Sequence, residues 1–328
     1  MNADIIRAGF LTTVQDLGRA GFRQFGVPVG GALDPHALDV ANLLVGNDKA
    51  AAGLEITFGG LHLRFSEDRI ATWCGGEFEV RIDSIAIPVG HPFLAGAGEQ
   101  LVVDRPQTGC RAWLAISGGV DVPIVLGSRS TDLRGNFGGL DGRPLHDGDE
   151  LPLGQNSERA MILLERLRNE RIAGWKPPHD WSSPAQREPV LRFVVGADQD
   201  RFNASTLQRF TNETFIVSPD SDRMGVRFDA PELKPTRAGD LISEAVAPGT
   251  VQVPPSGKPI LLLGDCQTIG GYPKIAHLIT VDLPIAAQLR AGDQVHFREV
   301  SLADAHRLWL ERECHLAQFR QGLDTHFA

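Results

Sequence analysis

The chain has 328 residues, of which 42% are hydrophobic and 22% are charged, a balance typical of folded globular proteins and not of disordered chains. At roughly 150 residues per domain, this length suggests about two domains. Lys and Arg number 32 against 41 Asp and Glu, which gives a formal net charge of −9. This acidity, without a basic run, argues against a nucleic-acid or anionic-membrane partner.

No apolar stretch approaches the ~20 residues that a membrane-spanning helix needs. The opening residues, Met1 to Asp4, lack the basic and apolar regions of a signal peptide. The cysteines form no C-x-x-C pair, which would indicate a zinc knuckle or a redox motif; they are Cys74, Cys110, Cys266 and Cys314. We therefore expect a cytoplasmic protein with reduced thiols.

The first half of the chain is expected to consist of short strands and one helix. Asp34 can cap a helix that begins at Pro35. Residues 61–65 and 77–82 alternate apolar and polar side chains, which is typical of half-buried strands. Residues 112–116 are uniformly apolar and suit a fully buried strand.

The second half shows a similar pattern. Residues 260–263 form an apolar run, and residues 191–195 are apolar apart from Arg192, so both suit buried strands. Residues 282–292 show a weaker helix pattern. From Ser301 onward the chain predicts a longer helix, because Ser301 and Asp304 fit a variant of the capping box.

The spacing of these strands and turns favours an all-β barrel or sandwich, because βαβ units would need regular crossover helices. Residues 174–189 are rich in Pro and Ser and have the composition of a linker. The sequence therefore predicts a mainly β protein with two β-domains.

Familiar catalytic signatures are missing from the sequence. It contains no P-loop, dinucleotide-binding fingerprint, zinc-protease motif or G-x-S-x-G nucleophile elbow. The 10 His residues show no metal-ligand spacing, so we expect no metal site. The candidate functional residues therefore lie in four polar clusters near turns.

The first cluster spans residues 12–19. Gln15 supplies an amide, Asp16 a carboxylate, and Arg19 a planar fork suited to an acidic substrate group. The alternative is a structural turn in which Asp16 caps the local backbone and Arg19 pairs with it.

The second and third clusters also carry arginines. Ser128, Arg129 and Ser130 lie in a Gly-flanked loop that suits a carboxylate or a phosphate, although a loop held by its own hydroxyl bonds is the alternative. Arg223 follows Asp222 in a turn, where such pairs are usually structural.

The fourth cluster, residues 264–274, follows the apolar run 260–263. Its chemistry-bearing residues are a carboxylate, an amide, a hydroxyl, a Gly pair, the chain's single Tyr and a Lys: Asp265, Gln267, Thr268, Gly270, Gly271, Tyr272 and Lys274. Asp265 can serve as a base, and the Gly pair lets the backbone approach a small polar substrate. Cys266 is a weaker nucleophile candidate, because no His lies near it in sequence.

Two glutamates stand beside apolar sequence. Glu55 lies between Leu54 and Ile56, and Glu244 precedes an Ala-Val pair. A buried carboxylate is costly unless it is paired. We expect each to pair with a basic side chain rather than to act as a perturbed acid.

Taken together, these clusters resemble the KipA-like family, also called allophanate hydrolase subunit 2 or the biotin-dependent carboxyltransferase family. Within it, the chain most resembles the C subunits of bacterial ATP-dependent 5-oxoprolinases. The matching stretches lie in order along nearly the whole chain: 13–19, 31–34 with 41–47, 127–132, 221–225, 251–257, and 265–268 with 270–276. Ile269 departs from the pattern, because relatives usually carry Thr or Ser there.

The resemblance implies two cyclophilin-like β-barrel domains with a few short helices. We place them at residues 1–180 and 186–300, followed by a C-terminal helical extension at residues 301–328. This implied fold agrees with the independent β pattern of the sequence.

The resemblance also implies an ATP-dependent amide (lactam) hydrolase that opens 5-oxoproline to glutamate. It implies two partners, a KipI-like 5-oxoprolinase B subunit and a LamB/YcsF-like A subunit. It further implies ATP binding by the complex, with no metal or biotin attached to this chain. Alternatives are the carboxyltransferase part of a biotin-dependent urea or amide carboxylase and a regulatory partner of a KipI-like kinase inhibitor.

For this activity we expect catalytic roles for Asp265 as base and for Gln267 and Thr268 as donors to the oxyanion. We expect Arg129 or Arg19 to bind the substrate carboxylate. The remaining substrate-binding candidates are Gln15, Asp16, Ser128, Ser130, Arg223, Gly270, Gly271, Tyr272 and Lys274. The hypothesis requires the four clusters to meet at one cavity.

Overall fold

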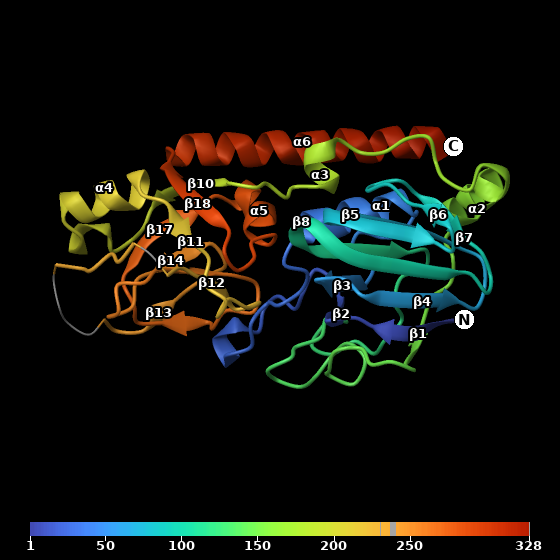
Figure 1. Ribbon diagram of the computed structural model, residues 1–328, viewed down its shortest axis with the longest axis horizontal. Coiled ribbons are helices and arrows are strands. Elements are labelled where there is room, and N and C mark those ends of the chain that lie inside the picture. Colours follow the sequence, from blue (N-terminus) through green and yellow to red (C-terminus); the bar gives the residue numbers. More distant parts are fainter. Residues whose placement is uncertain (230, 237–240, 328) are drawn as a thin grey trace. The chain divides into compact units, whose positions relative to one another are not determined.

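A computed structural model describes residues 1–229, 231–236 and 241–327 (Figure 1). The chain divides into two compact units, which do not follow a single cut along the sequence. The first unit comprises Met1–Arg19, Gly30–Ala185 and Phe319–Ala328, and the second comprises Ala20–Val29 and Gln186–Gln318.

The first unit is built on a nine-stranded sheet with the core order β2-β3-β8-β4-β1-β9, and β5 pairs with β6, β7 and β8. Its strands are β1 Asn2–Ala8, β2 Leu11–Gln15, β3 Gly53–Thr57, β4 Leu61–Phe65, β5 Arg69–Ile82, β6 Ile85–Ala86, β7 Phe93–Ala95, β8 Gln100–Ile116 and β9 Glu150–Pro152. The long strand β8 pairs with β4 through its first part and with β3 through its last part. Register shifts between β5 and β8 mark irregularities of the kind that bend and twist a sheet.

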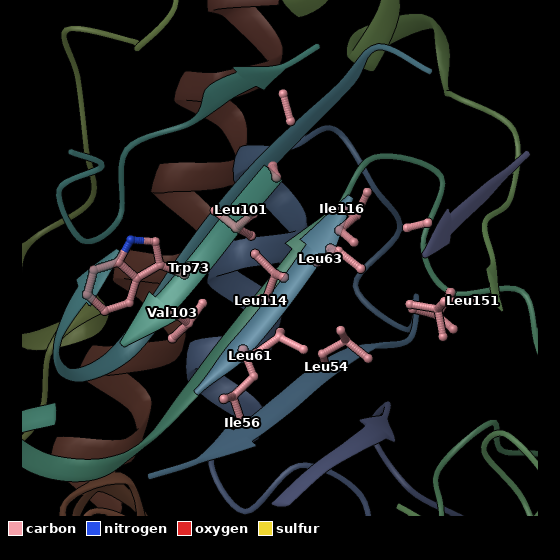
Figure 2. Close-up of a cluster of buried hydrophobic side chains, with 14 of the residues drawn as sticks. Leu54, Ile56, Leu61, Leu63, Trp73, Leu101, Val103, Leu114, Ile116 and Leu151 are labelled. Atoms are coloured by element: carbon pink, nitrogen blue, oxygen red, sulfur yellow. The ribbon is translucent and has the colours of Figure 1, made fainter. Parts of the chain in front are cut away.

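The core of the first unit lies on the inner face of this sheet, where Figure 2 shows side chains from several strands pointing toward one another. Strand β4 illustrates the pattern, because Leu61, Leu63 and Phe65 are buried and Arg64 between them is exposed. The predicted strands at 61–65, 77–82 and 112–116 are confirmed within β4, β5 and β8.

Three helices accompany the first sheet: α1 Pro35–Leu44, α2 Glu158–Glu170 and α3 His179–Ser182. The predicted cap of α1 is confirmed, because the Asp34 side chain accepts a hydrogen bond from the Ala37 N–H at 2.9 Å. Ser157 caps α2 in the same way through the N–H of Ala160. These caps satisfy N–H groups that a helix start leaves without partners.

The second unit holds a seven-stranded sheet in the order β11-β18-β10-β17-β14-β15-β12 and a separate two-stranded sheet, β13-β16. The strands are β10 Val190–Val195, β11 Phe215–Ile216, β12 Gly225–Arg227, β13 Glu244–Ala245, β14 Thr250–Gln252, β15 Ile260–Leu262, β16 Ile269–Gly270, β17 Lys274–Leu278 and β18 Gln294–Glu299. Its core contains mutually packed aromatic rings, among them Phe193, Phe210, Phe215, Phe228 and Phe297. The predicted strands at 191–195 and 260–263 are confirmed in β10 and β15.

The helical elements of the second unit are short, apart from α6, whose residues from Phe319 onward belong to the first unit. They are the 3₁₀ turns η1 Arg23–Phe25, η2 Gln199–Arg201 and η3 Thr280–Asp282, and the helices α4 Ala204–Asn212, α5 Leu283–Ala286 and α6 Leu302–Phe327. The helix expected over 282–292 is wrong in length, because α5 ends at Ala286. Asp282 does not cap it, since its buried carboxylate pairs with Arg192 instead.

The predicted C-terminal helix is confirmed as α6, and the Ser301 hydroxyl accepts a hydrogen bond from the Asp304 N–H at 3.0 Å. The apolar side chains of α6 are only partly buried, because Leu316 is 4% exposed whereas Trp309 is 43% exposed. The mainly β class, with two curled sheets, short helices and this last helix, is therefore confirmed. Among the described residues, no helix combines the length and the hydropathy that crossing a membrane requires.

Candidate functional site

Asp16 is the centre of a buried polar network in the first unit. Its Oδ1 accepts hydrogen bonds from Ser128 Oγ at 2.6 Å, Ser130 Oγ at 2.5 Å and the Gly18 N–H at 2.8 Å. Its Oδ2 accepts from the Arg129 N–H at 2.6 Å. The first two sequence clusters therefore meet, and the carboxylate ties one loop to the other.

The two arginines of this network already have partners within the protein. The Arg19 side chain is buried, donates to the Ser130 carbonyl and lies with its Cζ 4.8 Å from the centre of the Phe137 ring. The Arg129 guanidinium donates to Asp121 Oδ1 at 2.8 Å. These contacts give both guanidinium groups partners in the protein, and carboxylate binding by Arg19 or Arg129 stays a prediction.

Gln15 and Glu55 are also held inside the first unit. Gln15 is fully buried, and its Nε2 donates to Thr13 Oγ1 at 3.0 Å. Glu55 Oε2 accepts from the Leu33 N–H at 2.9 Å and from Trp113 Nε1 at 3.0 Å. The expected basic partner of Glu55 is Arg111, whose Nε lies 3.7 Å from Oε1.

The second unit contains a pocket of about 340 Å³. It is lined by Asp222, Met224, Gly225, Arg227, Gln252, Pro254, Ser256, Ile260, Leu262, Gln267 and Tyr272. Gln267 and Tyr272 were predicted site residues, so the fourth cluster contributes directly to this pocket. We take the pocket as the candidate substrate site, because a concave site with a few polar groups is the usual form of one.

Strand register explains how the floor of this pocket forms. Arg227 on β12 is directly opposite Ile260 on β15, and Ile260 is directly opposite Gln252 on β14. Directly opposed residues of neighbouring strands point to the same face of a sheet. Residues from three strands therefore form one row across the sheet.

Two carboxamides meet at the end of that row. Gln252 is 1% exposed, and its Oε1 accepts a hydrogen bond from Gln267 Nε2 at 3.3 Å. Gln252 Nε2 donates to the Tyr272 carbonyl at 3.4 Å. A Cβ added to Gly270 would lie 2.8 Å from Gln252 Nε2, so the absence of a side chain there leaves room for this amide.

The predicted base Asp265 is bound to a guanidinium. Arg223 Nε lies 2.8 Å from Asp265 Oδ2 and Nη2 lies 3.1 Å from Oδ1, which makes the pair bidentate. The two side chains are 6% and 13% exposed. Because Arg223 engages both carboxylate oxygens, the structure shows Asp265 as an ion-pair partner, and its role as base stays a prediction.

Lys274 links the two-stranded sheet to the rest of the second unit. Its Nζ lies 2.8 Å from Glu244 and 3.2 Å from Asp198. Burial lowers the pKa of Lys274, but hydrogen bonds to the two carboxylates outweigh it and the pKa is raised. The expected basic partner of Glu244 is thus present, although Glu244 itself is exposed and does not lie on a buried strand.

The Thr268 carbonyl accepts a hydrogen bond from the Val246 N–H at 3.1 Å, which fixes the turn before β16. Gly271 packs against Leu241, whose carbonyl oxygen would lie 3.0 Å from an added Cβ. Both residues therefore shape the loop that carries Gln267 and Tyr272 into the pocket.

Cys266 does not have the properties of a nucleophile. It is 3% exposed, and burial raises its pKa to about 11. The reactive form of a Cys is the thiolate, which is scarce at neutral pH when the pKa is so high. Among the described residues, no group of three or more His, Cys, Asp and Glu side chains is placed to hold a metal ion.

Sequence reasoning missed Arg227, Gln252 and Ser256 as pocket residues. Gln252 and Ser256 lie in the matched stretch 251–257, and Gln252 stands out there as a polar residue between Val251 and Val253. Arg227 carries no comparable signal, because only the pairing of β12 with β15 brings it to the pocket.

Comparison with known proteins shows the family to which the chain belongs. Residues 25–299 match the family described as carboxyltransferase domain, subdomain A and B, so the chain belongs to this family. It is 42% identical over 304 residues to the 5-oxoprolinase C subunit of Escherichia coli (strain K12), covering 92% of each chain. It is 34% identical to the protein of the same name in Haemophilus influenzae, covering 98% of each.

Solved structures agree with this assignment. The crystal structure of Kluyveromyces lactis urea carboxylase aligns with a TM-score of 0.88 at 28% identity, covering 98% of this chain and 29% of that one. The expected family is thus confirmed, and so is its β architecture.

Proposed function

We propose that this chain is the C subunit of an ATP-dependent 5-oxoprolinase, which opens the lactam of 5-oxoproline to glutamate together with partner proteins. The observation that carries the proposal is the 42% identity to a 5-oxoprolinase C subunit over 92% of both chains. The pocket is consistent with it, because its size suits a compact substrate and its two carboxamides suit an amide.

The lactam resists hydrolysis because its amide is stabilised by resonance. In the proposed reaction the γ-phosphoryl group of ATP would pass to the amide oxygen and activate the ring carbon. Water would then add to that carbon, the ring C–N bond would break as the nitrogen takes a proton, and phosphate would leave, so that glutamate, ADP and phosphate form. The protein must then hold the substrate, stabilise charge that develops on oxygen and position water. We propose that Gln267, Thr268 and the backbone N–H groups near Gly270 supply the donors, with Asp265, held by Arg223, as the base.

The same proposal includes the partners. A KipI-like B subunit and a LamB/YcsF-like A subunit would complete the enzyme in the cytoplasm. The sequence contains no P-loop, and we assign ATP to the complex as a whole.

A second candidate function is carboxyl transfer from carboxybiotin to a urea-like amide. The observation that favours it is the structural match to urea carboxylase at a TM-score of 0.88. In that reaction the same donors would stabilise the carbamate transition state. A biotinylated partner protein would distinguish it from lactam hydrolysis.

The test is reconstitution of the chain with its partners, followed by measurement of glutamate formed from 5-oxoproline with and without ATP. We expect glutamate only when ATP and every component are present. Biotin-dependent carboxylation of urea, with no glutamate formed, would support the second candidate and contradict the first.

A further inference from the structure

We propose that Arg227 binds the carboxylate of the substrate in the pocket of the second unit, and that Gln252 and Gln267 bind its amide group. The pocket then selects a compact amide that carries one carboxylate. This inference rests on the proposed function, since 5-oxoproline has this chemistry, but it adds two residues, Arg227 and Gln252, that none of the predicted roles includes.

Arg227 offers a free guanidinium on a fixed backbone. Its N–H donates to Ser221 Oγ at 3.0 Å, and its carbonyl accepts from the Ser218 N–H at 2.8 Å. Its guanidinium makes no hydrogen bond or ion pair with any residue that the structure describes. By contrast, Arg223 in the same segment is committed to Asp265.

An arginine without a protein partner is well suited to a carboxylate, because its planar fork gives two parallel, charge-assisted hydrogen bonds. Asp222 is the other charged residue lining the pocket. Its Oδ1 is used within the turn, where it accepts from the N–H groups of Met224 and Gly225 at 2.8 and 3.2 Å.

The distance between Arg227 and Gln252 along this row sets the size of a ligand that contacts both residues. Neighbouring strands lie about 4.8 Å apart, so the backbones at Arg227 and Gln252 are separated by roughly 10 Å. Ile260 lies between them and lines the same pocket, as does Leu262. A small ring can rest its methylene groups on these side chains while its two polar ends reach Arg227 and the amides.

The two carboxamides can bind both the N–H and the carbonyl oxygen of an amide group. Each carboxamide nitrogen carries two hydrogens, and Gln252 Nε2 and Gln267 Nε2 each donate one hydrogen bond to the described residues. Within the described part of the chain, Gln267 Oε1 accepts no hydrogen bond. A lactam N–H can therefore donate to Gln267 while the lactam carbonyl accepts from a remaining N–H.

The experiment measures ligand binding to the reconstituted complex by titration calorimetry, with two probes. One probe is 5-oxoproline, and the other is 2-pyrrolidinone, the same lactam without its carboxylate. We expect Arg227→Ala to weaken 5-oxoproline binding by about 10- to 100-fold and to leave 2-pyrrolidinone binding unchanged. Gln252→Leu should weaken the binding of both.

Arg298→Ala is the matched control, because Arg298 is also an exposed strand arginine of the second unit, and it does not line the pocket. It should bind both probes as the unchanged protein does, and Arg227→Lys should recover part of the affinity. Circular dichroism checks that each variant is folded.

Two results would overturn the inference: unchanged 5-oxoproline binding by the Arg227→Ala variant, or no binding of 5-oxoproline by the unchanged complex. If turnover is normal and Arg227→Ala has no effect, the proposed function stands and the pocket assignment falls. If 5-oxoproline binds through Arg227 but no glutamate forms, the pocket assignment stands and the proposed function falls.

Discussion

At the scale of single residues, Asp16 shows how a polar side chain in a loop can serve the fold. It accepts four hydrogen bonds, of which three come from residues 128–130 and one comes from the Gly18 N–H in its own loop. Since these donors are largely buried, they lose their partner if the carboxylate is removed.

We therefore expect Asp16→Ala to lower the free energy of unfolding by about 2–4 kcal/mol, because several donors would remain buried without an acceptor. Chemical denaturation of the purified chain measures this loss. Asp121→Ala is the control, since the Asp121 side chain is 58% exposed and its ion pair with Arg129 should contribute about 0–1 kcal/mol. Equal losses in the two variants would contradict the structural role of Asp16.

His277 gives a prediction about pH. Burial lowers its pKa in the folded chain, so the unfolded chain binds a proton at a higher pH than the folded chain does. Stability associated with His277 is therefore present above its unfolded pKa of about 6.5 and is lost as the pH falls below that value.

We expect the free energy of unfolding to fall between pH 7.5 and pH 5.5, and to fall less in His277→Gln than in the unchanged protein. Denaturant titrations at both pH values make the comparison. The difference between the two proteins isolates His277 from the other histidines. An equal or larger fall in the variant would show that His277 does not contribute in this way.

The pocket residues explain why the candidate site was only partly predictable. Gln267 and Tyr272 stand in a distinctive polar stretch, so the sequence alone marks them. Arg227 reaches the pocket only through its pairing with Ile260, some thirty positions away. Cross-strand neighbours have no fixed spacing in sequence, so a local pattern cannot reveal them.

At the scale of elements, capping residues and hydrophobic alternation predicted the helices and strands that local sequence preferences determine. The Asp34 cap and Pro35 define the start of α1, and strict alternation defines β4. The helix expected over 282–292 forms only over Leu283–Ala286, and a tertiary contact replaces its cap, because the Asp282 carboxylate binds Arg192 instead.

The short β13-β16 pair depends on Lys274. Its side chain is 13% exposed, and its ammonium group is shared between Glu244 of β13 and Asp198. An isolated pair of two-residue strands has little stability of its own. The ion pairs therefore help to hold the loop that carries Gln267 and Tyr272.

We expect Lys274→Met to speed backbone hydrogen exchange at residues 244–245 and 269–270, because it removes both ion pairs and keeps an apolar stem of similar length. Mass spectrometry after exchange in heavy water measures this change. Lys258→Met is the control, since Lys258 pairs with Asp229 at the surface. If exchange in β13 and β16 stayed as slow as in the control, Lys274 would not stabilise this pair.

At the scale of the whole molecule, two observations support the proposed function. The chain folds into two β-sheet units, and it is similar over nearly its full length to proteins named as 5-oxoprolinase C subunits. In the first unit, hydrogen bonds within the polar clusters join loops to one another. The second unit contains a pocket with a free arginine and two amides. The proposed chemistry therefore centres on the second unit.

The expectation that all four clusters share one cavity stays a prediction. Arg19 and Arg129 belong to the first unit, and Gln267 belongs to the second.

The most direct measurement is an omission assay on the reconstituted complex, following glutamate released from 5-oxoproline in the presence of ATP. We expect glutamate release with every component present, no release when this chain is left out, and full recovery when it is added back. Undiminished release from the partner proteins alone would contradict it.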